Sequence, residues 1–227
     1  MNSGKIILLN GVTCIEKTNI CTALQAVLDE PALYLGLEQL IDLLPNYKQV
    51  LPVGADRLAS TPRSNAMENN ALYACDSCGQ QVISGMHRMI AALASAGNYV
   101  IADHFLFDLR WLRECALLFC DLPVLLVSVR CPQEMSETYP QVTTLDTPGV
   151  YDLEVDPSLF SAHQCALQIK ERMLAGVPPM AWHWLKVWSD PAKHRGWIRG
   201  CPDQAELRPQ LGAAHLTAVH EKRMKKL

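Results

Sequence analysis

Near its start the sequence has a short apolar run that ends in a glycine turn and leads directly into a predicted helix. The run is KIILLN, residues 5–10, rich in isoleucine and leucine. A strand buried on both faces of a parallel sheet has this continuous pattern, because helices cover both of its faces. From Thr18 to Leu28 apolar residues recur at helical spacing, and Pro31 follows the end of this helix. The chain is therefore predicted to open with a strand, a turn and a helix.

The turn has the composition of a phosphate-binding loop. Such a loop needs a glycine after a strand, inward-pointing backbone N–H groups, a lysine for phosphate oxygens and a hydroxyl for Mg²⁺. Gly11, Lys17 and Thr18 follow this order and spacing. The fragment alone fits an ordinary strand-to-helix turn equally well, but its place after the first strand favours binding of ATP and Mg²⁺. The predicted cofactor-binding residues are Asn10, Gly11, Val12, Thr13, Cys14, Ile15, Glu16, Lys17 and Thr18.

One position of this loop departs from the pattern. Glu16 stands where a second glycine is expected, directly before Lys17. Glycine adopts backbone angles that other residues resist, and a carboxylate beside a polyphosphate adds like-charge repulsion. Glu16 could also pair with Lys17 and so compete with phosphate. The sequence therefore predicts a weakened loop.

Strands and helices alternate along the rest of the domain. Strands are predicted at 32–37, 99–103, 122–130 and 150–155, and helices at 38–44, 79–96, 109–119 and 160–174. Gly97 is the predicted left-handed cap at the end of one helix. The segment 46–75 is irregular and is interpreted as a long loop. This alternation predicts an α/β fold, an open parallel sheet with helices on both faces in three α/β/α layers.

The character of the chain changes near residue 176. Prolines cluster there, and the tail contains Trp182, Trp184, Trp188 and Trp197 and ends in EKRMKKL. We predict a domain over residues 1–176 and an appendage over residues 177–227, helical near its end. The tryptophans could cover an apolar face of the domain or mark a partner surface, and burial is the more common case.

Composition limits the partners. The 227 residues suit one domain with an appendage, and the net charge of -3 lacks the basic footprint of a nucleic-acid-binding protein. No apolar run approaches about 18 residues, so no membrane span is predicted. The nine cysteines do not form the pattern of a secreted disulfide framework. We therefore expect reduced core thiols, a cytoplasmic location and a small-molecule partner, while a homo-oligomer stays open.

Five stretches of sequence, in order, carry a resemblance to a known family. They are KIILLNG at the start, EPALYLGLEQLIDLLP at 30–45, SGMHRMIAALASAGNYVIADHFL at 84–106, LPVLLVSVRCP at 122–132 and GVYDLEVDPS at 149–158. Together they resemble the chloramphenicol phosphotransferase-like family of P-loop kinases over roughly residues 5–174. The resemblance implies a kinase that uses ATP to phosphorylate a hydroxyl of a small molecule, with chloramphenicol as the type substrate and antibiotic modification as a role.

The resemblance also implies roles for single residues. Lys17 and Thr18 match the phosphate and metal positions, and Asp103 matches an acidic residue that approaches Mg²⁺ through water. Glu38 falls where the family has an aspartate as the catalytic base. Its extra methylene moves the carboxylate by about 1 Å, a displacement that can cost ~100-fold in rate. Lys17 and Glu38 are thus the predicted catalytic residues, and Thr18 and Asp103 the predicted metal residues.

The largest departure from the family is in its lid. The family has an arginine-bearing helical lid between VRCP and GVYDLEVD, whereas this chain has neither Arg nor Lys from Cys131 to Ile169. Arginines clamp a transferring phosphoryl group, and candidate substitutes are Arg110, Arg113 and Arg130. The phosphate-binding loop, the catalytic base and the lid thus all differ from the pattern of the family. Two functions therefore stay open: a small-molecule kinase, or a relative that has weakened or lost the reaction and serves as a binding or interaction module.

Two further groups have weaker signals. Cys75 and Cys78 have the spacing of a zinc or redox pair, but His87 alone does not complete a four-ligand zinc site, so a loop with free thiols is favoured. His104 follows Asp103 at a strand end, where ligands of α/β proteins bind. It could contact substrate, although a lone histidine is more often structural.

Overall fold

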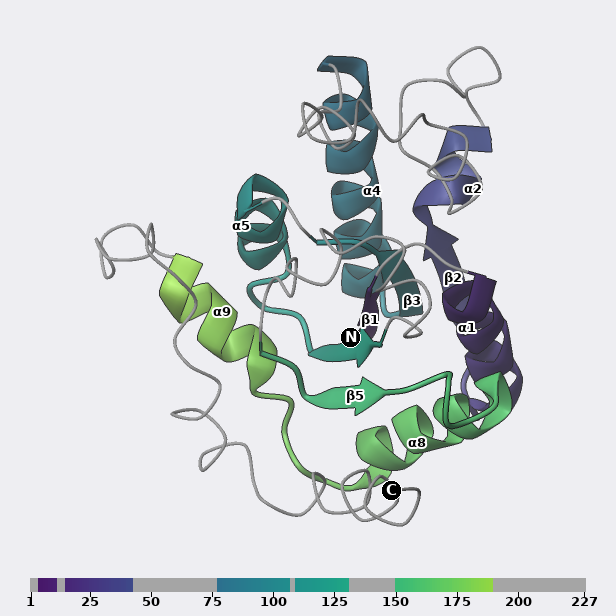
Figure 1. Cartoon of the computed structure of the whole chain (residues 1–227). Coiled ribbons are helices and arrows are strands. Elements are labelled where there is room, and N and C mark those ends of the chain that lie inside the picture. The colour runs from purple at the N-terminus through teal and green to yellow at the C-terminus, as the bar shows by residue number, and fades with distance from the viewer. Residues whose placement is uncertain (1–3, 12–14, 43–76, 107–108, 131–149, 190–227) are drawn as a thin grey trace, which may run out of the picture.

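A parallel sheet forms the centre of the protein in the computed structural model, which describes residues 4–11, 15–42, 77–106, 109–130 and 150–189. The described strands are β1 (Ile6–Asn10), β2 (Ala32–Gly36), β3 (Tyr99–His104), β4 (Val124–Val129) and β5 (Leu153–Val155), in the order β2-β3-β1-β4-β5. The described helices are α1 (Ile15–Val27), α2 (Leu37–Asp42), α4 (Ser77–Ser95), α5 (Leu109–Leu118), α8 (Ala162–Leu174) and α9 (Ala181–Ser189). Figure 1 shows their arrangement.

The two faces of the sheet carry separate cores. Side chains alternate along β1, so Ile6 and Leu8 pack with α4, α5 and α9, whereas Ile7 and Leu9 pack with α1 and α8. All five residues of β1 are buried, as expected for a strand covered on both faces. Figure 1 shows α1 and α8 packed together, apart from α5 and α9. The predicted three-layer α/β/α fold is confirmed.

Helix α1 begins earlier than the sequence predicts. Its first residue is Ile15 instead of Thr18, so Glu16 and Lys17 lie in its first turn. None of the described non-glycine residues has a positive φ. The backbone strain expected at Glu16 is therefore absent, because a residue with helical backbone angles does not need to be glycine.

The end of α4 confirms the predicted glycine cap. Gly97 has a φ of 97°, in the left-handed region that favours glycine. The N–H groups of Gly97 and Asn98 donate to the carbonyls of Ala94 and Leu93 at 3.0 and 3.1 Å. These bonds satisfy the last carbonyls of the helix and turn the chain into β3.

Helix α9 was not predicted, and it belongs to the core. It packs against α5 and β4, and Trp182 is 3% exposed with its ring centroid 5.6 Å from that of Phe119. The expected burial of the tail tryptophans is thus confirmed for Trp182. The core uses residues on both sides of the predicted boundary at 176, and the division of the chain into 1–176 and 177–227 stays a prediction.

The described cysteines are free thiols. Cys21, Cys115 and Cys165 are buried, as predicted. For Cys120 the expectation of a core thiol was wrong, because it lies in the turn after α5 and is exposed. Within the described part of the chain, no helix is long and apolar enough to cross a membrane. The predictions for the loop at 46–75, the Cys75–Cys78 thiols and the lid fall outside the described residues and side chains.

Candidate active site

The carboxyl ends of the strands form the edge of the sheet where the predicted site residues meet. The register pairs Asn10 at the end of β1 with His104 of β3, and Gly36 of β2 with Asp103. The connection from β1 leads to β2 on one side of β1. After β3, on that same side, the next strand β4 lies on the opposite side of β1. Ligands of α/β proteins bind at such a topological switch point, outside the carboxyl ends of the strands.

Lys17 is the buried cation of this edge. Its side chain is 1% exposed, and its Nζ donates to the carbonyl oxygens of Gly11 and His104, both at 2.8 Å. It also pairs with Oδ1 of Asp103 at 2.8 Å. An ammonium group has three N–H donors, and these contacts use all of them. Asp103, and not Glu16 as the sequence suggests, is therefore the carboxylate that pairs with Lys17.

Tyr34 joins two of the predicted site residues. Its hydroxyl donates to Oδ2 of Asp103 at 3.3 Å and lies near enough to the side chain of Thr18 for Thr18 to act on the pKa of Tyr34. Burial raises the pKa of Tyr34 strongly, and the negative charge of Asp103 adds to the rise. Thr18 and Asp103, predicted near the metal from segments far apart in sequence, thus both lie near this hydroxyl.

Tyr34 was not among the predicted site residues, although the sequence contains a signal for it. Alternation along β2 places Tyr34 on the same face as Ala32, the face that α1 covers. Because Lys17 lies in the first turn of α1, a tyrosine near the end of β2 on that face can reach the surroundings of Lys17.

Asn10 and Gly11 hold the end of β1 in place. The side chain of Asn10 accepts a hydrogen bond from the N–H of Leu106 at 2.7 Å and donates one to the hydroxyl of Tyr151 at 2.8 Å. A Cβ on Gly11 would lie 2.5 Å from the carbonyl oxygen of Val129, a backbone atom that cannot move aside cheaply. The first glycine of the loop is thus required by close packing against the end of β4.

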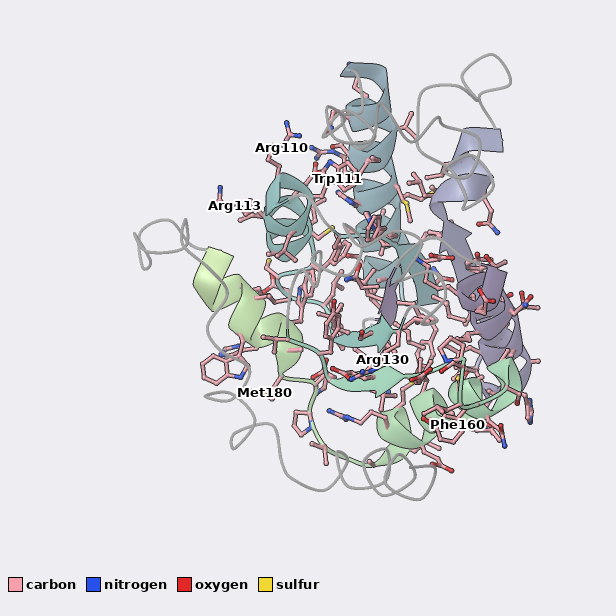
Figure 2. All side chains as sticks on the ribbon, in the orientation of Figure 1. Arg110, Trp111, Arg113, Arg130, Phe160 and Met180 are labelled. Atoms are coloured by element: carbon pink, nitrogen blue, oxygen red, sulfur yellow. The ribbon has the colours of Figure 1, made fainter. Side chains whose placement is uncertain are left out.

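For the other predicted site residues the structure gives less information. Glu38 is the second residue of α2, directly after β2 and at the same edge, but its side chain lies outside the described part, as do the side chains of residues 12–15. Arg130 donates from Nε to Glu154 at 3.1 Å. Figure 2 shows Arg110 and Arg113 projecting outward from α5. The structure thus gathers Lys17, Thr18 and Asp103, while it places two of the three candidate arginines on an outer surface.

A second polar group lies behind this edge, in the layer of α4 and α5. Nδ1 of His87 lies 2.8 Å from Oε2 of Glu114, and Nε2 of His87 lies 2.8 Å from Nε2 of His104. Both histidines are buried. The structural reading of His104 is confirmed, since its ring is 1% exposed and both ring nitrogens have partners.

The buried histidines predict a dependence of stability on pH. Burial lowers the pKa of His87, and burial, together with the repulsion that two protonated rings would exert on each other and the positive charge of Lys17, lowers that of His104 further. The unfolded chain binds protons near pH 6.5, so the stabilisation is complete above about pH 6.5 and is lost as the pH falls toward the lowered values. The loss should reach about 1.4 kcal/mol per pH unit for each histidine.

Urea unfolding at pH about 7.5 and about 5.5 checks this expectation. The variant H87Q should reduce the pH dependence, and H163Q, at an exposed histidine of α8, should leave it unchanged. An equal pH dependence in wild type and H87Q would contradict the assignment.

The order of strands and helices gives a fold that solved kinases share. The APS kinase CysC of Mycobacterium tuberculosis has this fold: its structure in complex with AMPPNP and APS matches with a TM-score of 0.52 and 13% identity, covering 77% of this chain and 99% of that one. A mutant of the same kinase matches with a TM-score of 0.51, 14% identity and the same coverage. At such identity the likeness shows the fold alone.

Sequence comparison gives the family. Residues 4–141 match the family described as "Chloramphenicol phosphotransferase-like protein", and the chain belongs to this family. Two curated proteins from two strains of Mycobacterium tuberculosis, each named "Putative O-phosphotransferase", are 26% identical to it over 203 residues, which cover 82% of this chain and 89% of theirs. The predicted family is thus confirmed, and the chain is of the P-loop kinase type of phosphotransferase.

Proposed function

We propose that the protein transfers the terminal phosphoryl group of ATP to a hydroxyl of a small molecule, an antibiotic of the chloramphenicol kind being the favoured acceptor. The observation that supports this most is Lys17, a buried ammonium at the switch point with a carboxylate and a hydroxyl beside it. Phosphoryl transfer is achieved almost entirely by positioning and electrostatics, so a preorganised cation is the central requirement. The buried free thiols suit a reducing compartment such as the cytoplasm.

The residues present fit Mg²⁺ and a polyphosphate. Thr18 and Asp103 offer oxygen donors, which Mg²⁺ prefers, and Mg²⁺ commonly takes one or two protein ligands and keeps several waters. When bound, the ion would neutralise charge on the phosphates. Lys17 would bind phosphate oxygens after leaving at least one of its present acceptors. Glu38 would accept the proton of the attacking hydroxyl.

Calorimetric titration with Mg²⁺ and a non-hydrolysable ATP analogue tests the nucleotide site. Wild type should bind with a Kd of about 1 to 100 μM, near the substrate affinities common for enzymes, and K17A should abolish the binding. Unfolding curves of K17A must show that the variant is folded at the titration temperature. Absence of binding by wild type would contradict the kinase proposal.

A second candidate function is a nucleotide-binding module without turnover. It is favoured by the lack of Arg and Lys from Cys131 to Ile169, which removes the usual clamp on the phosphoryl group. A transfer assay with labelled ATP and a panel of hydroxyl compounds that includes chloramphenicol separates the two candidates. Labelled product supports the kinase, and tight binding without any product supports the module.

Glu16 provides a gain-of-function prediction. Its carboxylate lies in the first turn of α1, where the positive end of the helix would otherwise attract phosphate. We expect E16G to increase the affinity for the ATP analogue about tenfold, equivalent to about 1.4 kcal/mol of removed repulsion. Glycine should also cost up to about 1 kcal/mol of stability in the helix.

The variant E16Q separates the effect of the negative charge on affinity from the effect of the backbone on stability. Glutamine keeps the helix propensity but removes the charge, so it should give most of the gain in affinity without the loss of stability. If neither variant changes the affinity in calorimetry, Glu16 is accommodated beside the phosphates and the loop is not weakened.

A further inference from the structure

Three buried or half-buried side chains connect two helices to the strand end that holds Lys17. They are Glu114 of α5, His87 of α4 and His104 of β3, called the Glu–His–His chain below. Its outer end is fixed by Ser84, whose hydroxyl donates to Oε1 of Glu114 at 2.5 Å, and by the exposed Arg88 at 3.5 Å from the same oxygen. Of these residues only His104 touches the site around Lys17, and it does so through its backbone carbonyl.

The hydrogen bonds allow one arrangement of protons in this chain. The N–H of Phe105 donates to Nδ1 of His104 at 2.7 Å, so Nδ1 carries no proton. The proton of the neutral ring is therefore on Nε2, and it is donated to Nε2 of His87. His87 must then carry its own proton on Nδ1, which it donates to the carboxylate of Glu114. Because an extra proton on either ring would set N–H against N–H, both rings are neutral.

Glu114 supplies the acceptor on which this order depends. Partial desolvation acts to raise its pKa, but the hydrogen bonds from Ser84 and His87 outweigh it and hold the pKa of Glu114 below its ordinary value. An ionised carboxylate accepts and cannot donate, so it selects the Nδ1–H form of His87. The second ring is then oriented by the first, as a metal-bound or catalytic histidine is oriented by its carboxylate.

The inner end of the chain meets the phosphate site through the backbone. The side chain of His104 points to the α4 layer, while its carbonyl oxygen accepts a hydrogen bond from Nζ of Lys17 at 2.8 Å. The preceding residue, Asp103, forms the ion pair with the same ammonium. Fixing the ring of His104 therefore constrains the backbone of the two consecutive residues that supply two of the three acceptors of Lys17.

Packing alone does not account for these histidines. On α4 the buried residues Ile83, Met86 and Ile90 are apolar, and His87 lies on the same stripe. Burying a polar ring there has an unfavourable desolvation cost that only its hydrogen bonds offset. An aliphatic residue at position 87 would fill the layer without that cost, so the hydrogen-bond chain requires its own explanation.

We propose that His87 and Glu114 are positioning residues of the phosphate site, which fix the neutral ring of His104 and thereby the carbonyl oxygen that receives Lys17. The proposal rests on the proposed function for the identity of the ligand, but the placement of Lys17 can be tested without any ligand.

The first experiment compares two variants of one residue. In H87Q the amide carbonyl can accept from Nε2–H of His104 and the amide N–H can donate to Glu114, whereas the leucine of H87L can do neither. H87L should weaken binding of Mg²⁺ and a non-hydrolysable ATP analogue by about 10-fold to 100-fold, the usual effect of removing a residue behind a ligand. H87Q should stay within about 3-fold of wild type.

The matched control is M86A, on the same helix and in the same core but outside the hydrogen-bond chain. It should destabilise the protein in urea unfolding while leaving the nucleotide affinity of the folded protein unchanged. Wild-type affinity in H87L, or a loss in M86A as large as in H87L, would overturn the proposal.

The second experiment needs no nucleotide. Long-range ¹H–¹⁵N NMR should show the Nε2–H form of His104 and the Nδ1–H form of His87, and the ammonium signal of Lys17 should move in H87L but not in H87Q. The opposite ring forms, or an unmoved Lys17 signal in H87L, would overturn the proposal. If wild type binds no nucleotide, the proposed function fails, while these signals still decide whether the chain positions Lys17.

Discussion

The variant D152A is expected to lower the free energy of unfolding by about 3–5 kcal/mol, the cost of removing one partner from a buried charged pair. The carboxylate side chain is 1% exposed and lies 3.9 Å from the guanidinium of Arg172. It accepts hydrogen bonds from the backbone of Leu126 at 3.0 Å, of Met180 at 2.6 Å and of Ala181 at 3.0 Å. Asp152 thus caps α9 from a distant segment and joins it to β4, and its loss leaves three N–H groups unsatisfied.

Urea unfolding of D152A beside D29A measures this effect. Asp29 also pairs with a cation of α8, Lys170 at 2.6 Å, but its side chain is 76% exposed, so D29A should cost less than about 1 kcal/mol. D152N should be intermediate, because an amide oxygen still accepts from the helix N-terminus. Similar midpoints for D152A and D29A would show that α9 is held by Trp182 and its apolar neighbours instead of by Asp152.

Asp152 illustrates why the sequence did not predict α9. The prolines at 178 and 179 and the tryptophans after them indicate a break in pattern, and the helix cap comes from a residue that lies 28 and 29 positions earlier. Helix signals are local, whereas this cap depends on the fold. The sheet was predictable because its strands are apolar runs with turn signals between them, and burial of both faces needs no longer-range information.

The sequence predicted the position of those site residues that follow from the order of the strands in the sheet. Lys17, Thr18 and Asp103 each follow or end a strand-like run, and carboxyl ends of parallel strands meet at one edge, so their meeting was expected and is observed. Their roles toward ATP and Mg²⁺ stay predictions. The partner of His104 was missed, although a polar residue on the apolar stripe of a helix, as at His87, indicates that a partner must be near.

The last prediction concerns the pair of Lys17 and Asp103 in the free protein. D103N should cost about 3–5 kcal/mol of stability, because it leaves a fully buried ammonium without its counter-charge. K17M should cost less, since the carboxylate that remains is 14% exposed and keeps its hydrogen bond from Tyr34. The double variant K17M/D103N removes both charges and should be close in stability to K17M alone.

Urea unfolding of the four proteins gives a coupling energy, which we expect to be about 3–5 kcal/mol, the cost of D103N alone, because the double variant and K17M should be nearly equal in stability. A coupling near zero would mean that the pair does not exist in the free protein and that Lys17 is available to phosphate from the start. A large coupling has a functional consequence. To bind, phosphate must displace Asp103 from Lys17, and Mg²⁺ must displace Lys17 from Asp103. Each ligand therefore weakens the Lys17–Asp103 ion pair, and this should make binding of the other ligand more favourable. We therefore expect the ATP analogue to bind wild type more tightly with Mg²⁺ than without it, and calorimetry in the presence of a chelator provides the comparison.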